Sequence, residues 1–167
     1  VSDVFVNLTQ EAQPVFYLFT PRLIPSDGGP DCPDAQDIVI RIWINPTPTL
    51  EVEVPDAIIC DTELFEINVS TPNSDLIAST LVYDLDVTYN PVFVNPGGIT
   101  PDGEYSGDWD INDLLINGSD TVQVITYRLT ARVRDDRPGH GGEFCDNGTD
   151  TTVAVSYTHL RAPRDRG

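Results

Sequence analysis

The stretch IRIWINPTPTLEVEV, residues 40–54, contains two runs in which apolar and polar residues alternate, as they do in half-buried β-strands. The segment NPTPT, residues 45–49, separates the two runs, and its prolines lack the N–H group that a central strand donates to its neighbours. We therefore expect one strand to end at Ile44 and a short extended connector to lead into a new strand. This pattern predicts a joint between two units of an all-β chain.

An internal repeat supports a division at this joint. Residues 13–42 are similar to residues 123–155. The two copies first align as Gln13 with Gln123 and, beyond a Gly-Gly loop that is longer in the second copy, as Cys32 with Cys145. Each copy has an alternating strand, a loop with a cysteine and a second alternating strand, which is the pattern of a β-hairpin with a long tip. A period of this length is that of a domain rather than of a solenoid turn. The matched pairs are Gln13 with Gln123, Tyr17 with Tyr127, Thr20 with Thr130, Arg22 with Arg132, Cys32 with Cys145, and Asp37 with Asp150.

The repeat divides the chain into three parts. We expect residues 1–44 to be the C-terminal hairpin of a preceding repeat, residues 45–157 a complete repeat, and residues 158–167 a non-native or disordered tail, with a genuine basic tail as the alternative. Within the complete repeat only residues 110–118 favour a helical turn, with Asp110 as its cap. Short strands with almost no helix predict an antiparallel β-sandwich. The expected strands cover residues 50–54, 64–70, 79–94, 121–134 and 151–157.

The charge of the chain is strongly negative, since 27 acidic residues against 9 basic ones give a net charge of −18. Such a field repels phosphate backbones and anionic membranes, which excludes nucleic acid as a partner. It favours a well-solvated surface in salty water, or the attraction of divalent cations. No apolar run reaches the ~20 residues of a membrane-spanning helix, and the first residues lack a signal-peptide pattern. We therefore expect an internal piece of a longer protein, without a membrane span.

These features together resemble a known family. The joint at residues 45–48, Cys60 early in the repeat, the strand TYRLTARV at residues 126–133 and Cys145 ahead of the last strand are similar to PKD-like, immunoglobulin-like repeats. Such repeats stand in tandem in very large secreted surface proteins of Bacteroidetes-type bacteria. The resemblance implies an immunoglobulin-like β-sandwich that acts as a non-catalytic, extracellular spacer or adhesion module. It also implies neighbouring repeats, surface glycans and host or environmental polymers as partners.

Three cysteines allow one disulfide within the complete repeat. Cys60 and Cys145 both belong to residues 45–157, and a bridge between them would contribute roughly 4 to 5 kcal/mol in the chain-entropy model. Two free buried thiols are the alternative. Cys32 is the repeat equivalent of Cys145, so we expect its partner in the preceding repeat and an unpaired thiol in this chain, with a reactive thiol as the alternative.

The acidic segment TPDGEYSGDWDINDL, residues 100–114, supplies enough oxygen atoms for a calcium ion, which takes about six to eight oxygen ligands. The segment lacks the glycine and the glutamate that an EF-hand loop requires. A solvated loop is the alternative, and we expect no other cofactor. The candidate ligands are Asp102, Asp108, Asp110, Asn112 and Asp113.

Two tryptophans raise a second function, the binding of sugars. Trp109 lies among the acidic residues, so the alternative function is a carbohydrate-binding module that uses loop aromatics and acidic residues with the assistance of calcium. Trp43 lies beside the joint, where packing between modules is the simpler explanation. We expect no enzyme, because His140 is the one credible base and His159 lies in the tail.

Four Asn-x-Ser/Thr triplets occur in the chain. In a β-protein rich in Asn and Thr such triplets arise by chance, and a bacterial source would not normally modify them. The triplets begin at Asn7, Asn68, Asn117 and Asn147.

An isolated hairpin is marginal in water, because its apolar face and its edges have no partners. We therefore expect residues 1–44 to self-associate through exposed strand edges or to be locally disordered, while residues 46–157 remain compact. The apolar side chains that need cover are Phe5, Val15, Tyr17, Phe19, Ile38, Ile40 and Ile42.

Overall fold

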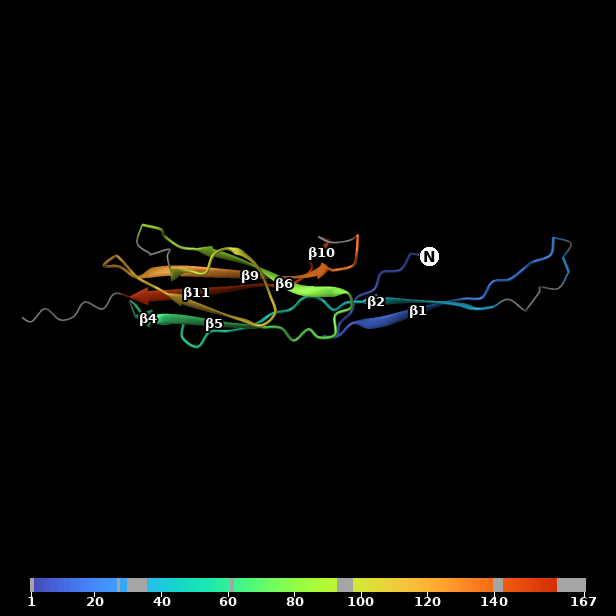
Figure 1. Ribbon diagram of the computed structural model, residues 1–167, viewed down its shortest axis with the longest axis horizontal. Coiled ribbons are helices and arrows are strands. Elements are labelled where there is room, and N and C mark those ends of the chain that lie inside the picture. Colours follow the sequence, from blue (N-terminus) through green and yellow to red (C-terminus); the bar gives the residue numbers. More distant parts are fainter. Residues whose placement is uncertain are drawn as a thin grey trace, which may run out of the picture.

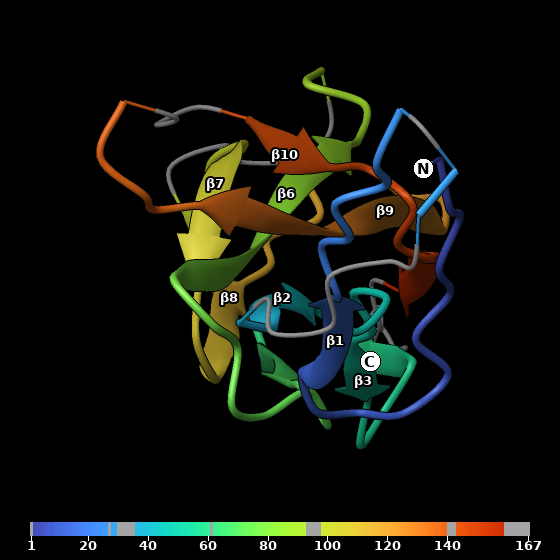
Figure 2. The ribbon, with the colours of Figure 1, turned by 90° about the vertical axis from the view of Figure 1, so that its right-hand side faces the viewer.

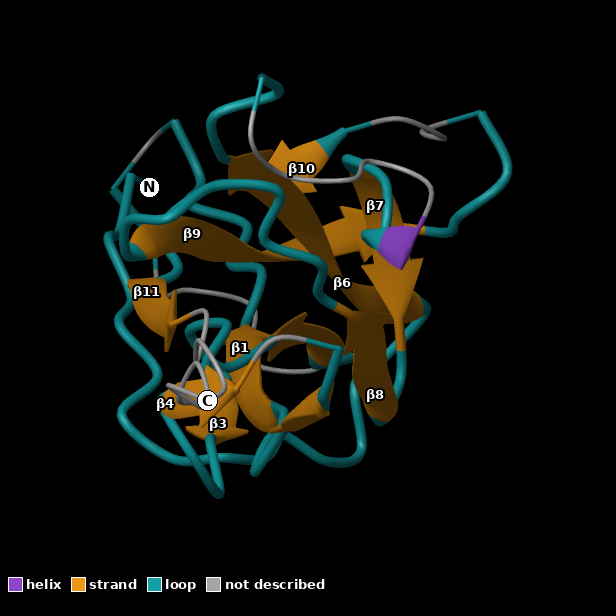
Figure 3. Cartoon of the chain, turned by 90° about the vertical axis from the view of Figure 1, so that its left-hand side faces the viewer, coloured by secondary structure: helices purple, strands orange, loops and turns teal. Residues whose placement is uncertain are grey.

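A computed structural model describes residues 2–26, 28–29, 36–60, 62–92, 98–139 and 143–158. The molecule is elongated, with a two-stranded hairpin that projects from one end of a larger body of strands (Figure 1). Strands and loops make up nearly all of the described chain, which confirms the predicted all-β class (Figure 3). Within these ranges no helix is long and apolar enough to cross a membrane.

The strands form three sheets. The largest has the order β4-β11-β9-β6-β7, with β10 also beside β9; a three-stranded sheet has the order β3-β5-β8, and β1 pairs with β2 in the hairpin. All of these pairs are antiparallel except β4 with β11, which run parallel. The bounds are β1 Gln13–Phe19, β2 Ile38–Ile44, β3 Glu51–Glu53, β4 Ile58–Cys60, β5 Leu64–Ser70, β6 Ser79–Thr88, β7 Gly103–Ser106, β8 Trp109–Leu114, β9 Gln123–Asp135, β10 Phe144–Cys145 and β11 Asp150–Thr158.

The six-stranded and three-stranded sheets share one hydrophobic core. Ile67 and Ile111 enter it from β5 and β8, whereas Tyr127 and Val155 enter it from β9 and β11, and all four are fully buried. The alternation in the sequence explains this packing, because every second residue of β9 is buried as far as Val133. Burial of one such aliphatic side chain contributes roughly 1.5 to 3 kcal/mol. The shared core therefore holds the two sheets together as one module.

Two of the predicted elements need correction. No helical turn forms at residues 110–118, because β8 occupies the first part of this range and pairs with β5. Buried Ile111 alternates there with exposed Asp110 and Asn112, which is the period of a strand, so Asp110 caps no helix. The strand predicted over residues 79–94 ends at Thr88 as β6. The other four predicted strands correspond to β3, β5, β9 and β11.

The hairpin projects from the body of strands in Figure 1 and faces the viewer in Figure 2. Many of its apolar side chains are exposed. Phe16 and Leu18 of β1 are 61% and 63% exposed, and Val39 of β2 is 61% exposed. Such a ribbon presents both an apolar surface and free strand edges to solvent, which leaves it poorly stabilised by itself.

The hairpin has the same strand register as β9 with β11. Residues of β1 correspond to residues of β9 as Gln13 corresponds to Gln123, and residues of β2 correspond to residues of β11 as Ile44 corresponds to Tyr157. With this correspondence, every Cα pair between β1 and β2 has an equivalent pair between β9 and β11. The repeat seen in the sequence is therefore also a repeat of strand pairing. Examples are Gln13–Ile44 with Gln123–Tyr157, and Phe19–Ile38 with Leu129–Thr151.

Candidate functional site

The acidic segment runs through β7 and β8, two strands that belong to different sheets, so the predicted calcium ligands are spread from the start of β7 to the end of β8. Asp113 points into the core, whereas Asp110 and Asn112 are exposed on the other face of β8. Asp102 lies directly before β7, and its carboxylate accepts a 2.7 Å hydrogen bond from the backbone N–H of Val87. Across the described residues no group of three or more His, Cys, Asp or Glu side chains is arranged to hold a metal ion. The predicted ligands Asp102, Asp108, Asp110, Asn112 and Asp113 are thus not brought together into one site.

Trp109, the predicted sugar platform, is half-buried in a stack of aromatic rings. Its ring lies 4.1 Å from that of Tyr105, with an angle of 12° between the ring planes, and Tyr105 in turn stacks on Tyr83. A sugar-binding tryptophan needs an open ring face. Tyr105 covers one face of the Trp109 ring, and Trp109 also packs against the core, so its main contacts are with other side chains of the module.

The predicted disulfide between Cys60 and Cys145 is not formed, and both thiols are free and exposed. The strand register gives the reason. Cys60 lies on β4 at the Gln123 end of the large sheet, whereas Cys145 is the Cα partner of Val133. Ten residues of β9 separate these two positions, which is roughly 33 Å of strand. A disulfide needs Cα atoms within about 7 Å, so the predicted bridge is corrected to two separate thiols.

Trp43 lies on β2 next to the joint, as predicted from its position. It is 38% exposed, and the Arg41 guanidinium lies 5.0 Å from its ring centroid in a cation–π contact. The other predicted positions, Cys32, His140 and His159, and the tail from residue 159 onward lie outside the described residues.

A tyrosine–aspartate hydrogen bond occurs twice in the chain, buried in the module and exposed in the hairpin. The hydroxyl of Tyr127 donates a 2.6 Å hydrogen bond to Oδ2 of Asp113. Burial and this hydrogen bond raise the pKa of Tyr127. At the equivalent positions of the hairpin, Tyr17 donates a 2.7 Å hydrogen bond to Oδ2 of Asp3. The hydrogen bond to Asp3 is the main cause that raises the pKa of Tyr17, because this hydrogen bond lies at the exposed surface of the hairpin, where burial contributes less.

A second network is also repeated. The side chain of Asn117 donates to the backbone carbonyls of Thr121 and Tyr157 and accepts from both the N–H and the hydroxyl of Ser119. Asn7 makes the same four hydrogen bonds in the hairpin, where its partners are Glu11, Ile44 and Thr9. Asn7 and Asn117 are only 8% and 3% exposed. These two Asn-x-Ser/Thr triplets therefore specify a turn that closes the start of each hairpin onto its end.

The two networks show that the repeat begins earlier than the sequence alignment placed it. The alignment starts at Gln13, but the equivalence extends back to Asp3, ten residues before it. The missed signal is an aspartate followed four residues later by an Asn-x-Ser/Thr triplet, which occurs at residues 3–9 and 113–119. The residues between these positions are apolar but not identical, which hid the match.

Hydrogen bonds fix the joint between the hairpin and the module. The side chain of Asn45 donates to the hydroxyl of Ser79 at 3.0 Å and accepts from the N–H of Ile77 at 3.0 Å. On the other side of the joint, Asn73 donates to the side chain of Gln10 at 2.8 Å and accepts from the N–H of Thr49 at 2.7 Å. Both asparagines thus tie the connector to loops of the module.

A further backbone contact joins the turn of the hairpin to the module. The N–H of Ser74 donates to the carbonyl of Gln10 at 2.9 Å, and Glu11 forms a β-bridge with Ser74. Together with the side chains of Asn45 and Asn73, these contacts hold the hairpin against the module at several separated points, so the joint is a defined interface.

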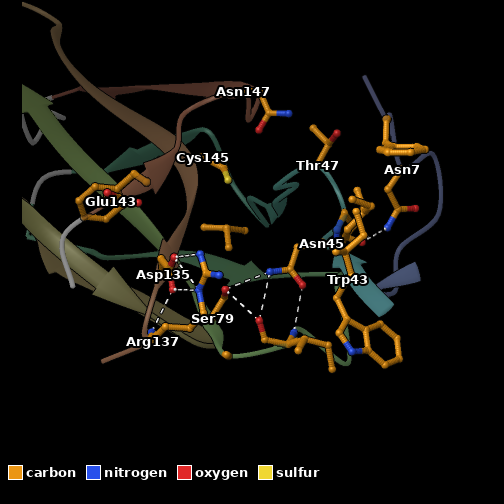
Figure 4. A pocket seen from close by; sticks show the side chains of 18 of the residues that line it. Asn7, Trp43, Asn45, Thr47, Ser79, Asp135, Arg137, Glu143, Cys145 and Asn147 are labelled. Atoms are coloured by element: carbon orange, nitrogen blue, oxygen red, sulfur yellow. Dashed lines mark hydrogen bonds and ion pairs between the residues drawn. The ribbon is translucent and has the colours of Figure 1, made fainter. Parts of the chain in front are cut away.

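A cavity of about 710 Å³ lies at the joint (Figure 4). Trp43 and Asn45 line it from the hairpin side, whereas Asp135, Cys145 and Asn147 line it from the module. Asp135 forms an ion pair there with Arg137. The cavity has mixed polar and apolar walls and lies where the hairpin meets the module.

No protein-family model matches the chain, and no curated protein matches it either.

Proposed function

We propose that residues 45–157 form an immunoglobulin-like module of a tandem series, and that the chain acts as a non-catalytic spacer and adhesion unit of an extracellular protein. The observation that carries this proposal is the joint, where a hairpin with the register and side-chain networks of β9 and β11 is hydrogen-bonded to a following module. A repeated unit connected in this way is suited to extension.

The order of the strands supports the immunoglobulin-like assignment. One sheet combines β3, β5 and β8, and the facing sheet combines β4, β11, β9, β6 and β7. The segment ahead of β5 is thus split between the two sheets, and consecutive strands change sheet as in a Greek-key sandwich. The strand that would correspond to strand F of an immunoglobulin fold is β9. It carries Tyr127, whose hydroxyl is hydrogen-bonded inside the core.

The joint supports the spacer role, because a spacer must hold its modules at a fixed distance and angle. Pro46 and Pro48 limit the backbone of the connector, and Asn45 and Asn73 tie it to the module on both sides. The net charge of −18 supports an exposed, well-hydrated surface role, since it disfavours non-specific association between such chains.

Carbohydrate binding remains the alternative function for the β7–β8 region. Its support is weaker, because Tyr105 covers one face of Trp109. A glycan array with the intact chain and with Trp109→Ala separates the two functions. Saturable sugar binding that is lost in the variant would favour the alternative, whereas the spacer function predicts no such binding.

Small-angle X-ray scattering of the full chain tests the spacer function directly. We expect one elongated shape for the native chain and a broad distribution of shapes for the double variant Asn45→Ala, Asn73→Ala, because the variant loses the hydrogen bonds that fix the joint. Asn112→Ala is the matched control, since Asn112 is exposed on β8 and lies outside the joint. A native chain as flexible as the double variant would contradict a spacer role.

A further inference from the structure

We propose that the open face and the two free edges of the β1–β2 hairpin are a docking surface for another part of a repeat. The segment that docks there is a set of strands equivalent to residues 45–112 of this chain, and it stands in tandem ahead of Asp3. This inference rests on the proposed tandem function and specifies what a neighbouring repeat must supply. It follows from the way in which the module covers β9 and β11.

The side chains that need cover match those that the module buries. In the module, the buried positions of β9 and β11 that face the other sheet include Ile125, Tyr127 and Val155. In the matched register, their equivalents in the hairpin are Val15, Tyr17 and Ile42, which are only half-buried. Each equivalent is apolar or is the same tyrosine, so the hairpin presents the same kind of surface to a covering sheet. Further along the same face, Phe19 and Ile40 are 44% and 47% exposed.

The edges of the hairpin match in the same way. In the module, β9 pairs with antiparallel β6, with Tyr127 opposite Val87, and β11 pairs with parallel β4, with Tyr157 opposite Ile59. In the described part of the chain β1 and β2 pair with each other alone. A copy of β6 would therefore lie along β1, and a copy of β4 would lie along β2. Pairing of this kind satisfies backbone groups that an isolated ribbon leaves to solvent.

One hydrogen-bond acceptor specifies the covering layer further. In the module, Oδ1 of Asp113 accepts from the N–H of Thr100 at 2.9 Å and from its hydroxyl at 2.6 Å, while Oδ2 accepts from Tyr127. In the hairpin, Oδ2 of Asp3 accepts from Tyr17. A copy of Thr100, which belongs to the proposed layer, would place its two donors at Oδ1 of Asp3. The layer is thus recognised by polar as well as apolar groups.

A tandem chain tests the docking surface. It carries a copy of residues 45–112 joined directly to Asp3 of the full chain, because Asp3 is equivalent to Asp113. Hydrogen exchange is measured at the amides of β1 and β2 in the original chain and in the tandem chain. We expect these amides to exchange at least about 100-fold more slowly in the tandem chain, and those of β9 and β11 to be protected in both.

A matched variant separates docking from a general change in the chain. Phe19→Asp in the tandem chain should return β1 and β2 to fast exchange while β9 and β11 stay protected, because Phe19 is exposed in the original hairpin and buried only by the layer. Fast exchange of β1 and β2 in an otherwise folded tandem chain would overturn the proposal. The proposal would also be overturned if β1 and β2 of the original chain became protected only when the chain forms a dimer. In that case a second molecule would cover the hairpin. Neither result depends on the shape of the joint, which the scattering experiment tests separately.

Discussion

Tyr127 donates a 2.6 Å hydrogen bond to Asp113 inside the core, where the two residues are 0% and 1% exposed. The chain contains the same bond a second time, between Tyr17 and Asp3, at 2.7 Å and on an exposed hairpin. One molecule therefore holds a buried and an exposed version of one interaction, and each version serves as the control for the other.

Removal of the hydroxyl should be costly at the buried position alone. Tyr127→Phe leaves Oδ2 of Asp113 without its donor in the core, which should lower the free energy of unfolding by about 1 to 3 kcal/mol. Tyr17→Phe should change it by less than about 0.5 kcal/mol, because water replaces the lost donor at an exposed site. Urea unfolding of both variants measures the difference. Equal effects of the two substitutions would show that the two pairs do not differ in burial.

The stability of the module should fall as the pH rises above 10. Burial raises the pKa of Tyr83 to about 12, and burial with the hydrogen bond to Asp113 raises the pKa of Tyr127, both from an ordinary value of 10.0. Between pH 10 and about 12 the unfolded chain therefore loses protons that the folded chain retains, so the free energy of unfolding decreases with rising pH. Below pH 10 the tyrosines are protonated in both states, and their contribution is constant.

Urea unfolding between about pH 9 and pH 12 checks this dependence. Tyr83→Phe should make the decline less steep, because it removes one of the tyrosines whose pKa is raised by folding. The same variant should cost little at neutral pH, since the hydroxyl of Tyr83 is buried without a hydrogen-bond partner among the described residues. A free energy of unfolding that stays constant from pH 10 to pH 12 would show that neither pKa is raised.

The two asparagine networks predict another matched pair of variants. Asn117→Ala should destabilise the module by about 1 to 3 kcal/mol, because it removes the donor to the buried carbonyl group of Tyr157 and to the part-buried carbonyl group of Thr121. Asn7→Ala should leave the unfolding of the module unchanged and increase hydrogen exchange in β2, whose end it holds through Ile44. Calorimetry and hydrogen exchange measure the two effects. A large loss of module stability in Asn7→Ala would mean that the hairpin and the module fold as one unit.

The cysteines give a prediction for the tandem chain. In the module, Cys60 is the Cα partner of Thr158, and the residue equivalent to Thr158 in the hairpin is Asn45. A copy of Cys60 in the docked layer would thus lie beside Asn45, which lines the same cavity as Cys145. We expect the copied cysteine and Cys145 to form a disulfide across the joint when oxidised glutathione is supplied. The two thiols lose two protons and two electrons, and glutathione disulfide is reduced to two thiols.

Peptide mapping under non-reducing conditions detects this bridge, and Cys145→Ser should abolish it. In the original chain both Cys60 and Cys145 should react with iodoacetamide without denaturant, because both are exposed. A bridge between Cys60 and Cys145 of the same module would contradict the strand register described here.

The sequence predicted those features that depend on local periodicity. The alternation around residues 40–54 indicated the strand that ends at Ile44 and the joint that follows it, and the alternation after Gln123 indicated β9. It did not indicate β8, because Asp110 and Asn112 have a low strand propensity and Asp110 has the character of a helix cap. Pairing with β5 overrides that local preference.

The features that depend on register could not be predicted in this way. Cys60 and Cys145 share a module, yet only the pairing of β4 with β11 and of β10 with β9 shows that they lie at opposite ends of one sheet. The same holds for Asp113, which appeared to belong with the other acidic residues of its loop. Its side chain enters the core because residues of a strand alternate between two faces.

Native-state hydrogen exchange on the original full chain, combined with light scattering, tests the central division at Asn45 most directly. We expect slow exchange in β9 and β11, which are covered by β6, β4 and the facing sheet. We expect much faster exchange in β1 and β2, which have the same register but no covering layer among the described residues. Equal protection of both hairpins in a monodisperse monomer would show that residues 1–44 complete a single domain, and would contradict the division of the chain into two repeats.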